Sequence, residues 1–286
     1  MSYSKRRRRG FGRILFLFLI VIVAALFYDS NTRLVTEEYE IESSSLPENF
    51  DGLKIVQLSD LHNAEFGENN EKLLRKVAAA EPDLIAVTGD LIDGDRADSY
   101  VRELMTGLAA IAPVYYVTGN HEWASGWIQE LFDLLKECDV TVLRNEYVLL
   151  ARGGDTIVLA GADDPNGPYD MFTHSQLVSE IREREGERYI LMLYHRNDDL
   201  AEWEELGVDA VLCGHAHGGV IRLPFTDGLI SPEREWFPDI TSGLHEFGET
   251  DILISRGLGN RSGTIRFWNN PEIVEATLRA SEKKEA

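Results

Sequence analysis

Three patterns of hydrophobic and polar residues follow one another along the chain. Residues 14–28 form one uninterrupted apolar run, and residues 29–50 mix acidic residues, serines and a Leu-Pro break around a single extended segment. From residue 53 onward, short apolar runs alternate with segments whose apolar residues recur every three or four positions. Parallel strands joined by crossover helices give such a pattern. The pattern predicts strands at residues 54–58, 84–88 and 114–118 and helices at residues 70–80, 99–111 and 127–137.

The pattern changes after residue 138 to one typical of a mixed sheet. A hairpin is expected where two apolar stretches flank the turn Arg152-Gly-Gly-Asp155. We see no internal repeat and no second domain, and we therefore expect one domain over residues 51–280, preceded by a linker at residues 29–50. Beyond the hairpin, the spacing predicts a helix at residues 175–185 and strands at residues 189–194, 210–213, 220–223, 252–255, 264–267 and 273–278.

The apolar run at residues 14–28 predicts a membrane helix. Fifteen residues span about 22 Å as a helix, less than a hydrocarbon core of about 30 Å, but Phe11, Gly12 and a snorkelling Arg13 supply most of the difference. No small-residue cleavage site follows, so residues 1–28 are expected to be a basic tip and an uncleaved single-pass signal anchor. The run Arg6 to Arg9 favours a cytoplasmic N-terminus, with the domain on the extracytoplasmic side of the cell membrane. The same arginines resemble a twin-arginine export signal, which any run of four would imitate.

Charge separates the N-terminus from the rest of the chain. The chain has 28 basic and 49 acidic residues, and six of the basic ones lie within the first 28 positions, so the remainder has a net charge of −27. Such a domain repels the backbones of DNA and RNA, and no nucleic-acid partner is expected. The two cysteines are too few for a disulfide framework.

Polar residues follow five of the predicted strands, at or just after their carboxyl ends. Gly89-Asp90 is central among them, because Gly89 permits a close backbone approach and one carboxylate at a sheet edge is well placed to bridge two metal ions. Alternate residues at the end of a strand can point the same way, which suits chelation. The other motifs are Asp60-Leu-His62, Gly119-Asn120-His121-Glu122, His195 and His215-Ala-His217.

Histidine is concentrated in these motifs. Five of the seven histidines lie in them, beside two aspartates and an asparagine, and only His174 and His245 lie elsewhere. A lone histidine at a strand end is ordinarily a structural residue, whereas five at separate strand ends predict a metal site.

The ordered set D-x-H, G-D, G-N-H-E, H and G-H-x-H resembles the calcineurin-like metallophosphoesterase superfamily over residues 53–278. The resemblance implies an α/β fold of two packed mixed β-sheets flanked by helices, a four-layer α/β/β/α sandwich. It also implies metal-dependent hydrolysis of phosphomonoester, phosphodiester or pyrophosphate bonds. The anchor layout, the run Leu-Cys-Gly-His-Ala-His-Gly-Gly and Ser255-Arg-Gly-Leu-Gly259 are most similar to a membrane-anchored bacterial branch that includes UDP-2,3-diacylglucosamine pyrophosphatases. That branch implies a membrane or lipid-linked substrate.

The resemblance further implies two metal ions that share Asp90. Mixed nitrogen and oxygen ligands suit Mn, Fe or Zn, and two such ions about 3.5–4 Å apart activate a water and orient the phosphoryl group. One ion would take Asp60, His62 and His217, and the other Asn120, His195 and His215.

His121 lies beside the ligand Asn120 and is not needed as a ligand. We expect it to act with Asp90 and Asn120 in catalysis, stabilising the transition state or protonating the leaving oxygen, with Glu122 as its orienting partner. Three arginines, Arg256, Arg261 and Arg266, could contact a phosphate or lie at the surface.

Two other functions stay open from the sequence. The chain could be a nucleotide or general phosphodiesterase, which a substrate panel would separate from a lipid-directed enzyme. It could also be a non-catalytic metal-binding surface module, which would contain metal but turn over no phosphodiester. The intact set of ligands favours an enzyme, and we expect a monomer whose partners are the membrane and a phosphoester substrate.

Overall fold

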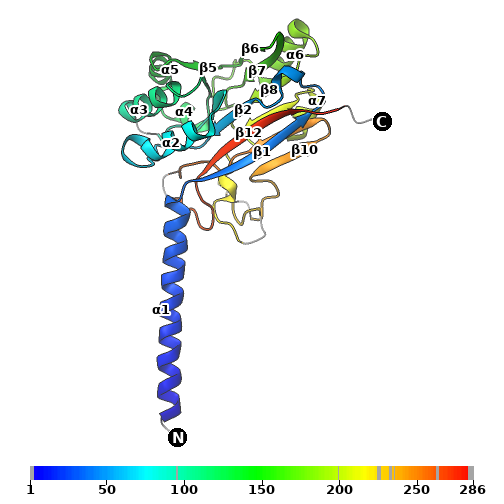
Figure 1. Cartoon of the computed structure of the whole chain (residues 1–286). Helices are drawn as coiled ribbons and strands as arrows, with labels where there is room; N and C mark the ends of the chain where they lie inside the picture. The colour runs from blue at the N-terminus through cyan, green and yellow to red at the C-terminus, as the bar shows by residue number, and fades with distance from the viewer. Residues whose placement is uncertain are drawn as a thin grey trace.

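The computed structural model describes residues 3–94, 96–198, 200–223, 227–231, 234, 236–261 and 264–282, with the backbone alone for residues 3–12. Two six-stranded sheets pack face to face, helices cover their outer faces, and one long helix leaves the domain like a stalk (Figure 1). The predicted fold of two mixed sheets flanked by helices is confirmed.

The first sheet has the strand order β1-β12-β2-β3-β4-β5. Strands β2 to β5 run parallel, whereas β12 is antiparallel to β2 and parallel to β1. All five residues of β3 are buried, because a parallel strand between two covered faces needs apolar side chains on both. The strands are β1 (Val35–Ser43), β2 (Lys54–Leu58), β3 (Leu84–Thr88), β4 (Val114–Val117), β5 (Val140–Val142) and β12 (Glu272–Ala280).

The second sheet has the order β10-β11-β9-β8-β7-β6. Its central strands β7, β8, β9 and β11 are parallel, and an antiparallel strand closes each edge. The expected hairpin is the β6–β7 pair, in which Arg152 faces Asp155 across the turn. The strands are β6 (Glu146–Arg152), β7 (Asp155–Gly161), β8 (Ile190–Leu193), β9 (Ala210–Cys213), β10 (Gly243–Phe247) and β11 (Thr250–Ile254).

Alternate side chains of the strands enter different cores. Ile55 of β2 lies in the core between the sheets, whereas Val56 packs beneath the helices of the first sheet. Helices α2, α3 and α5 cover that sheet, and α6 and α7 cover the second. The helices are α1 (Tyr3–Thr32), α2 (Glu71–Ala80), α3 (Asp98–Ala109), α4 (Asn120–Ala124), α5 (Ile128–Glu137), α6 (His174–Glu185) and α7 (Leu200–Glu205), with short 3₁₀ turns at Glu48–Phe50, Glu68–Asn70 and His217–Gly219.

Three segments differ from the sequence-based expectation. Residues 29–50, expected as a linker, begin with the last turn of α1 and contain β1, which pairs with β12 along its whole length because Tyr39 and Ile41 pack into the core between the sheets. Residues 220–223 and the described residues at 264–267 form isolated bridges, Ile221 with Phe267 among them, where strands were expected. Contacts around the site described next, rather than pairing within a sheet, hold these two segments in place.

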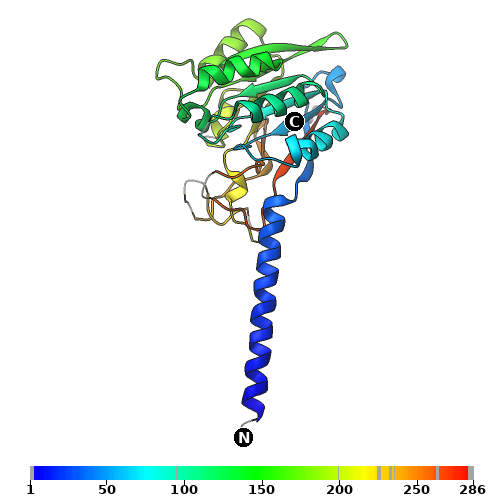
Figure 2. The same cartoon turned by 90° about the vertical axis from the view of Figure 1, so that its left-hand side faces the viewer.

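Helix α1 stands apart from the cores. Within it, residues Arg13–Thr32 are long and apolar enough to cross a membrane. Its side chains at residues 13–25 are exposed, and the helix projects away from the domain in two views at right angles (Figures 1 and 2).

Candidate metal centre

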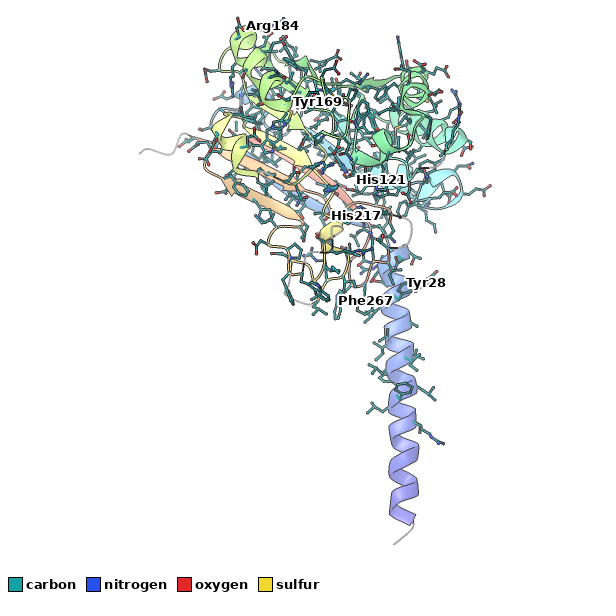
Figure 3. All side chains as sticks on the ribbon, turned by 180° about the vertical axis from the view of Figure 1, so that it is seen from behind. Tyr28, His121, Tyr169, Arg184, His217 and Phe267 are labelled. Carbon is teal, nitrogen blue, oxygen red and sulfur yellow. The ribbon has the colours of Figure 1, made fainter. Side chains whose placement is uncertain are left out.

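The carboxyl ends of five strands meet at one edge where the two sheets pack together. Five loops carry polar side chains to this edge, following β2, β3, β4, β8 and β9. His121 and His217, which come from different sheets, lie close together near the middle of the domain (Figure 3). The residues brought to this edge are Asp60, His62, Asp90, Asn120, His121, His195, His215 and His217.

The first cluster contains Asp60, His62, Asp90 and His217, all buried, with donor atoms within 4.8 Å of one another. The Nε2 atoms of His62 and His217 face each other at 3.1 Å. Oδ1 of Asp60 lies 3.3 Å from Nε2 of His217, and Oδ2 of Asp90 lies 3.6 Å from Nε2 of His62. Four donor atoms therefore converge on one point.

The second cluster contains Asp90, His195 and His215. Nε2 of His195 lies 3.3 Å from Oδ2 of Asp90 and 3.2 Å from Nδ1 of His215. Nδ1 of His195 donates to the Thr88 carbonyl at 2.8 Å, which directs Nε2 at the cluster. Asp90 is the member that both clusters share.

Backbone conformation aims these side chains. Asp60, His62, Asp90, His215 and His217 all have positive φ, between 45° and 66°, a region that residues other than glycine rarely occupy. The expectation that alternation along an extended strand end directs them was wrong, because left-handed turns after the strands do so.

Close backbone packing explains the two glycines of these motifs. A Cβ atom on Gly89, whose φ is +86°, would lie 2.6 Å from Nδ1 of His195 and 2.7 Å from the Gly119 nitrogen. A Cβ on Gly119 would collide with the Asp90 side chain. The close approach predicted at Gly89 is therefore present, and it brings β3, β4 and β8 together around Asp90.

Asn120 is flanked in sequence by two residues, Gly119 and His121, that both contact Asp90. Its neighbour Gly119 packs on Asp90, and the backbone nitrogen of His121 donates to Oδ1 of Asp90 at 2.9 Å. The Asn120 Oδ1 atom is buried and has no hydrogen-bond partner among the described residues. A buried carbonyl oxygen without a partner is costly, and a cation bound next to this loop would satisfy it.

Glu122 fixes the loop that carries Asn120 by binding backbone nitrogens. Its carboxylate accepts hydrogen bonds from the backbone nitrogens of Gly119 at 2.6 Å, Asp90 at 3.0 Å and Ile92 at 3.3 Å. Burial and the nearby Asp90 carboxylate raise the pKa of Glu122 to about 7. Glu122 was expected to orient His121, and that prediction was wrong because its oxygens face these backbone donors.

Asp93 orients His121 instead. Its Oδ1 atom lies 3.0 Å from Nδ1 of His121, while Nε2 of His121 points toward the cluster, 4.0 Å from Oδ2 of Asp90. The His121 ring also meets the His62 ring edge-on, with centroids 4.6 Å apart. Sequence reasoning missed Asp93, although its position three residues after Asp90 on the same loop was an available signal.

Burial and charge divide the histidines into two groups. Burial lowers the pKa of His62 and lowers that of His217 to about 3, so both rings are neutral and offer lone pairs. Burial also opposes protonation of His195, but the Asp90 and Asp60 carboxylates outweigh it and raise the pKa of His195 to about 10. The second cluster therefore holds a proton where a cation would bind.

The three arginines considered as phosphate ligands have different surroundings. Arg266 is buried, with Nη2 donating to the Gly259 carbonyl at 2.8 Å and lying 3.3 Å from Nδ1 of His217. Arg256 pairs with Glu272 and Glu37, and Arg261 is exposed. Arg266 therefore supports the metal centre through its contact with His217.

The donor set fits a divalent-metal centre. It offers buried neutral imidazoles, buried carboxylates and an amide oxygen without a partner, arranged as two clusters on either side of one carboxylate. Imidazole and carboxylate donors suit Mn, Fe and Zn. Six of the seven residues expected as ligands lie in these two clusters, and the seventh, Asn120, lies on the loop that contacts Asp90.

Comparison with known proteins agrees with this geometry. Residues 53–219 match the calcineurin-like phosphoesterase family, and because this is more than half of the chain, the protein belongs to that family. It is 33% identical to the uncharacterized metallophosphoesterase YkuE of Bacillus subtilis, covering 86% of each chain. It is 29% identical to the phosphodiesterase YaeI of Escherichia coli, covering 79% of this chain and 82% of the relative.

A bovine transmembrane protein with a metallophosphoesterase domain is 29% identical over 85% of this chain and 56% of its own length. The family membership confirms the superfamily inferred from the five motifs. The chain is therefore a metal-dependent phosphoric ester hydrolase.

Proposed function

We propose that the protein is a dinuclear-metal phosphoesterase, held at a membrane by α1, that hydrolyses a phosphoester carried by a lipid. The observation that supports two ions is the position of Asp90, which contacts His62 on one side and His195 on the other. Asp60, His62 and His217 would hold one ion, Asn120, His195 and His215 the other, and Asp90 both. Bound there, two divalent ions would supply Lewis-acid activation of water and neutralise charge on the phosphoryl group.

The chain's own residues orient this chemistry. Asp93 accepts the Nδ1 proton of His121, which turns Nε2 of His121 toward the cluster. With the ring protonated at both nitrogens, Nε2 can give its proton to the leaving oxygen while Nδ1 stays bonded to Asp93. Glu122 maintains the Asn120 loop by binding three backbone nitrogens. The carbonyl of Thr88 fixes the ring of His195.

The exposed apolar surface of α1 supports the membrane placement. The side chains of residues 13–25 are exposed, and hydrocarbon is the environment that such an apolar surface favours. The name of the bovine relative, a transmembrane protein, points the same way. The arginines at positions 6–9 support a cytoplasmic N-terminus with the domain outside.

A substrate panel tests this function. The full chain, purified in detergent, would be stripped with a chelator, reloaded separately with Mn, Fe or Zn, and assayed on lipid-linked, nucleotide and sugar phosphates. We expect metal-dependent turnover with preference for the lipid-linked substrate. Preference for nucleotides would favour the general phosphodiesterase, and metal uptake without turnover of any ester would contradict the enzyme.

A further inference from the structure

The last turn of α1 is hydrogen-bonded to residues 264–270, here called the docking segment. The Trp268 backbone nitrogen donates to Oγ of Ser30 at 2.7 Å. Nδ2 of Asn31 donates to the Arg266 carbonyl at 2.9 Å, and Nδ2 of Asn270 donates to the Asp29 carbonyl at 2.8 Å. Three consecutive residues of α1 thus bind the docking segment, so the helix end has a defined position on the domain.

The docking segment presents apolar side chains on the same side as the helix. Ile265 is 56% exposed and Trp268 is 47% exposed. Phe267 lines an apolar groove whose other wall consists of α1 residues between Leu19 and Phe27. Phe267 lies beside α1 close to the level of Tyr28 (Figure 3). The segment therefore reaches the apolar part of the helix.

A second loop adds to this apolar surface. The Arg222 backbone nitrogen donates to the Phe267 carbonyl at 3.0 Å, which joins the loop that begins at residue 220 to the docking segment. This loop exposes Leu223 at 44%, Trp236 at 68% and Phe237 at 66%. Both views show the yellow and orange loops beside the last turns of α1, at the end of the domain from which the helix leaves (Figures 1 and 2).

We propose that these two loops are a second membrane contact, inserting Leu223, Trp236, Phe237, Ile265, Phe267 and Trp268 into the bilayer surface beside α1. The proposal rests on the placement of α1 in a membrane given above. Contiguous exposed apolar patches are rare on soluble monomers, and tryptophan favours the membrane–water interface. A domain with a net charge of −27 is repelled by anionic headgroups, so apolar insertion supplies the attraction that charge does not.

The docking segment also touches the metal centre from its other face. Arg266 and Asn269 point inward, where Nη2 of Arg266 lies 3.3 Å from Nδ1 of His217 and Nδ2 of Asn269 donates to the His217 carbonyl at 2.7 Å. Residues next to each other in sequence thus contact the bilayer and support the centre. This arrangement holds the centre at the height of the headgroups, where the phosphoester of a membrane lipid lies.

Tryptophan fluorescence tests the contact without requiring activity. The full chain would be placed in nanodiscs of phosphatidylcholine, either unmodified or brominated on the acyl chains near the headgroup, since bromine quenches nearby tryptophans. Of the five tryptophans, Trp127 and Trp203 are buried and Trp123 is half-buried on α4, so the quenching that depends on Trp236 and Trp268 reports the contact. We expect quenching of the wild type and its loss in the double variant Trp236→Phe/Trp268→Phe, which keeps the apolar surface.

A matched control uses Tyr169, which is fully exposed and lies farther from α1 than His121 and His217 do (Figure 3). Tyr169→Trp in the double-variant background should restore fluorescence but not quenching. Protein that enters nanodiscs but shows no quenching, or equal quenching from position 169, would overturn the proposal, and a protein partner would then be the better occupant of the patch. Failure to enter nanodiscs would instead overturn the placement of α1.

Activity separates this proposal from the function on which it rests. Ile265→Ser/Trp268→Ser should leave turnover of soluble bis(p-nitrophenyl) phosphate unchanged and lower turnover of a phosphodiester lipid in the same nanodiscs. Equal turnover of the lipid by the variant and the wild type would overturn the role of the contact. A wild type that hydrolyses neither substrate with metal would overturn the proposed function, while the quenching result would remain valid.

Discussion

Replacing His121 with alanine should separate catalysis from metal binding. His121 donates through Nδ1 to Asp93 and directs Nε2 toward the cluster, 4.0 Å from Oδ2 of Asp90, but neither of the two proposed ligand sets includes it. General acid catalysis contributes about 10²–10⁴-fold. We therefore expect a loss of that size in kcat on esters with poor alkyl leaving groups. The loss should be much smaller on nitrophenyl esters, whose leaving group needs no proton.

Asp93→Asn gives a graded version of the same test. The amide oxygen can still accept from Nδ1 of His121, but the bond is no longer assisted by charge. Bonds to charged groups contribute about 1.5–3 kcal/mol and neutral ones about 0.5–1.5 kcal/mol, so the loss should be about 1–1.5 kcal/mol. That corresponds to roughly tenfold in kcat. Steady-state kinetics on paired alkyl and nitrophenyl diesters measures both variants.

His174→Ala is a matched control, because His174 also pairs with a carboxylate, with Nε2 lying 3.1 Å from Oε2 of Glu202, outside the metal centre. It should leave the kinetics unchanged. Elemental analysis should find the same metal content in wild type and His121→Ala. Equal losses on good and poor leaving groups would refute acid catalysis by His121 and indicate that it only positions the phosphate.

Two further predictions concern the ligands. Metal binding should strengthen as pH rises toward about 10, since the raised pKa keeps His195 protonated in the metal-free protein and a cation must displace that proton. Calorimetry in buffers of different ionisation enthalpy measures the proton released, and none near neutral pH would contradict this account. Gly89→Ala should reduce metal content and activity while circular dichroism stays native, because its Cβ would lie 2.6 Å from Nδ1 of His195; full metal retention would contradict the packing argument.

The elements with strong periodicity were the ones that sequence predicted well. Strand β3, with five buried residues of which four are apolar, and the spaced leucines of α2 and α5 give clear patterns, because the strand is covered on both faces and each helix on one. Short elements such as β5, with three residues, carry too few positions for a period to show. β1 was not predicted as a strand of the first sheet, because its acidic residues obscure the pattern of a strand. Its pairing partner, β12, also lies more than 200 positions later in sequence.

At the site, residue type and order predicted which side chains gather there, but their orientation had to come from the structure. Positive φ at Asp60, His62 and Asp90 is a property of the turns after the strands, and no strand pattern reveals it. The partner of His121 is Asp93 rather than the expected Glu122 for a similar reason. Adjacency in sequence favoured Glu122, whereas α4 turns that side chain inward to the backbone nitrogens of Gly119 and Asp90.

Metal content of the active protein is the most direct test of a dinuclear centre built on Asp90. The full chain, reloaded with a single type of ion to saturation and freed of excess, would be assayed for turnover and for ions per chain by elemental analysis. We expect two ions in the wild type, and in Asp90→Asn fewer ions with activity reduced by at least about 10³-fold, several kcal/mol of barrier. An active wild type that holds no more than one ion per chain at saturation would contradict the account.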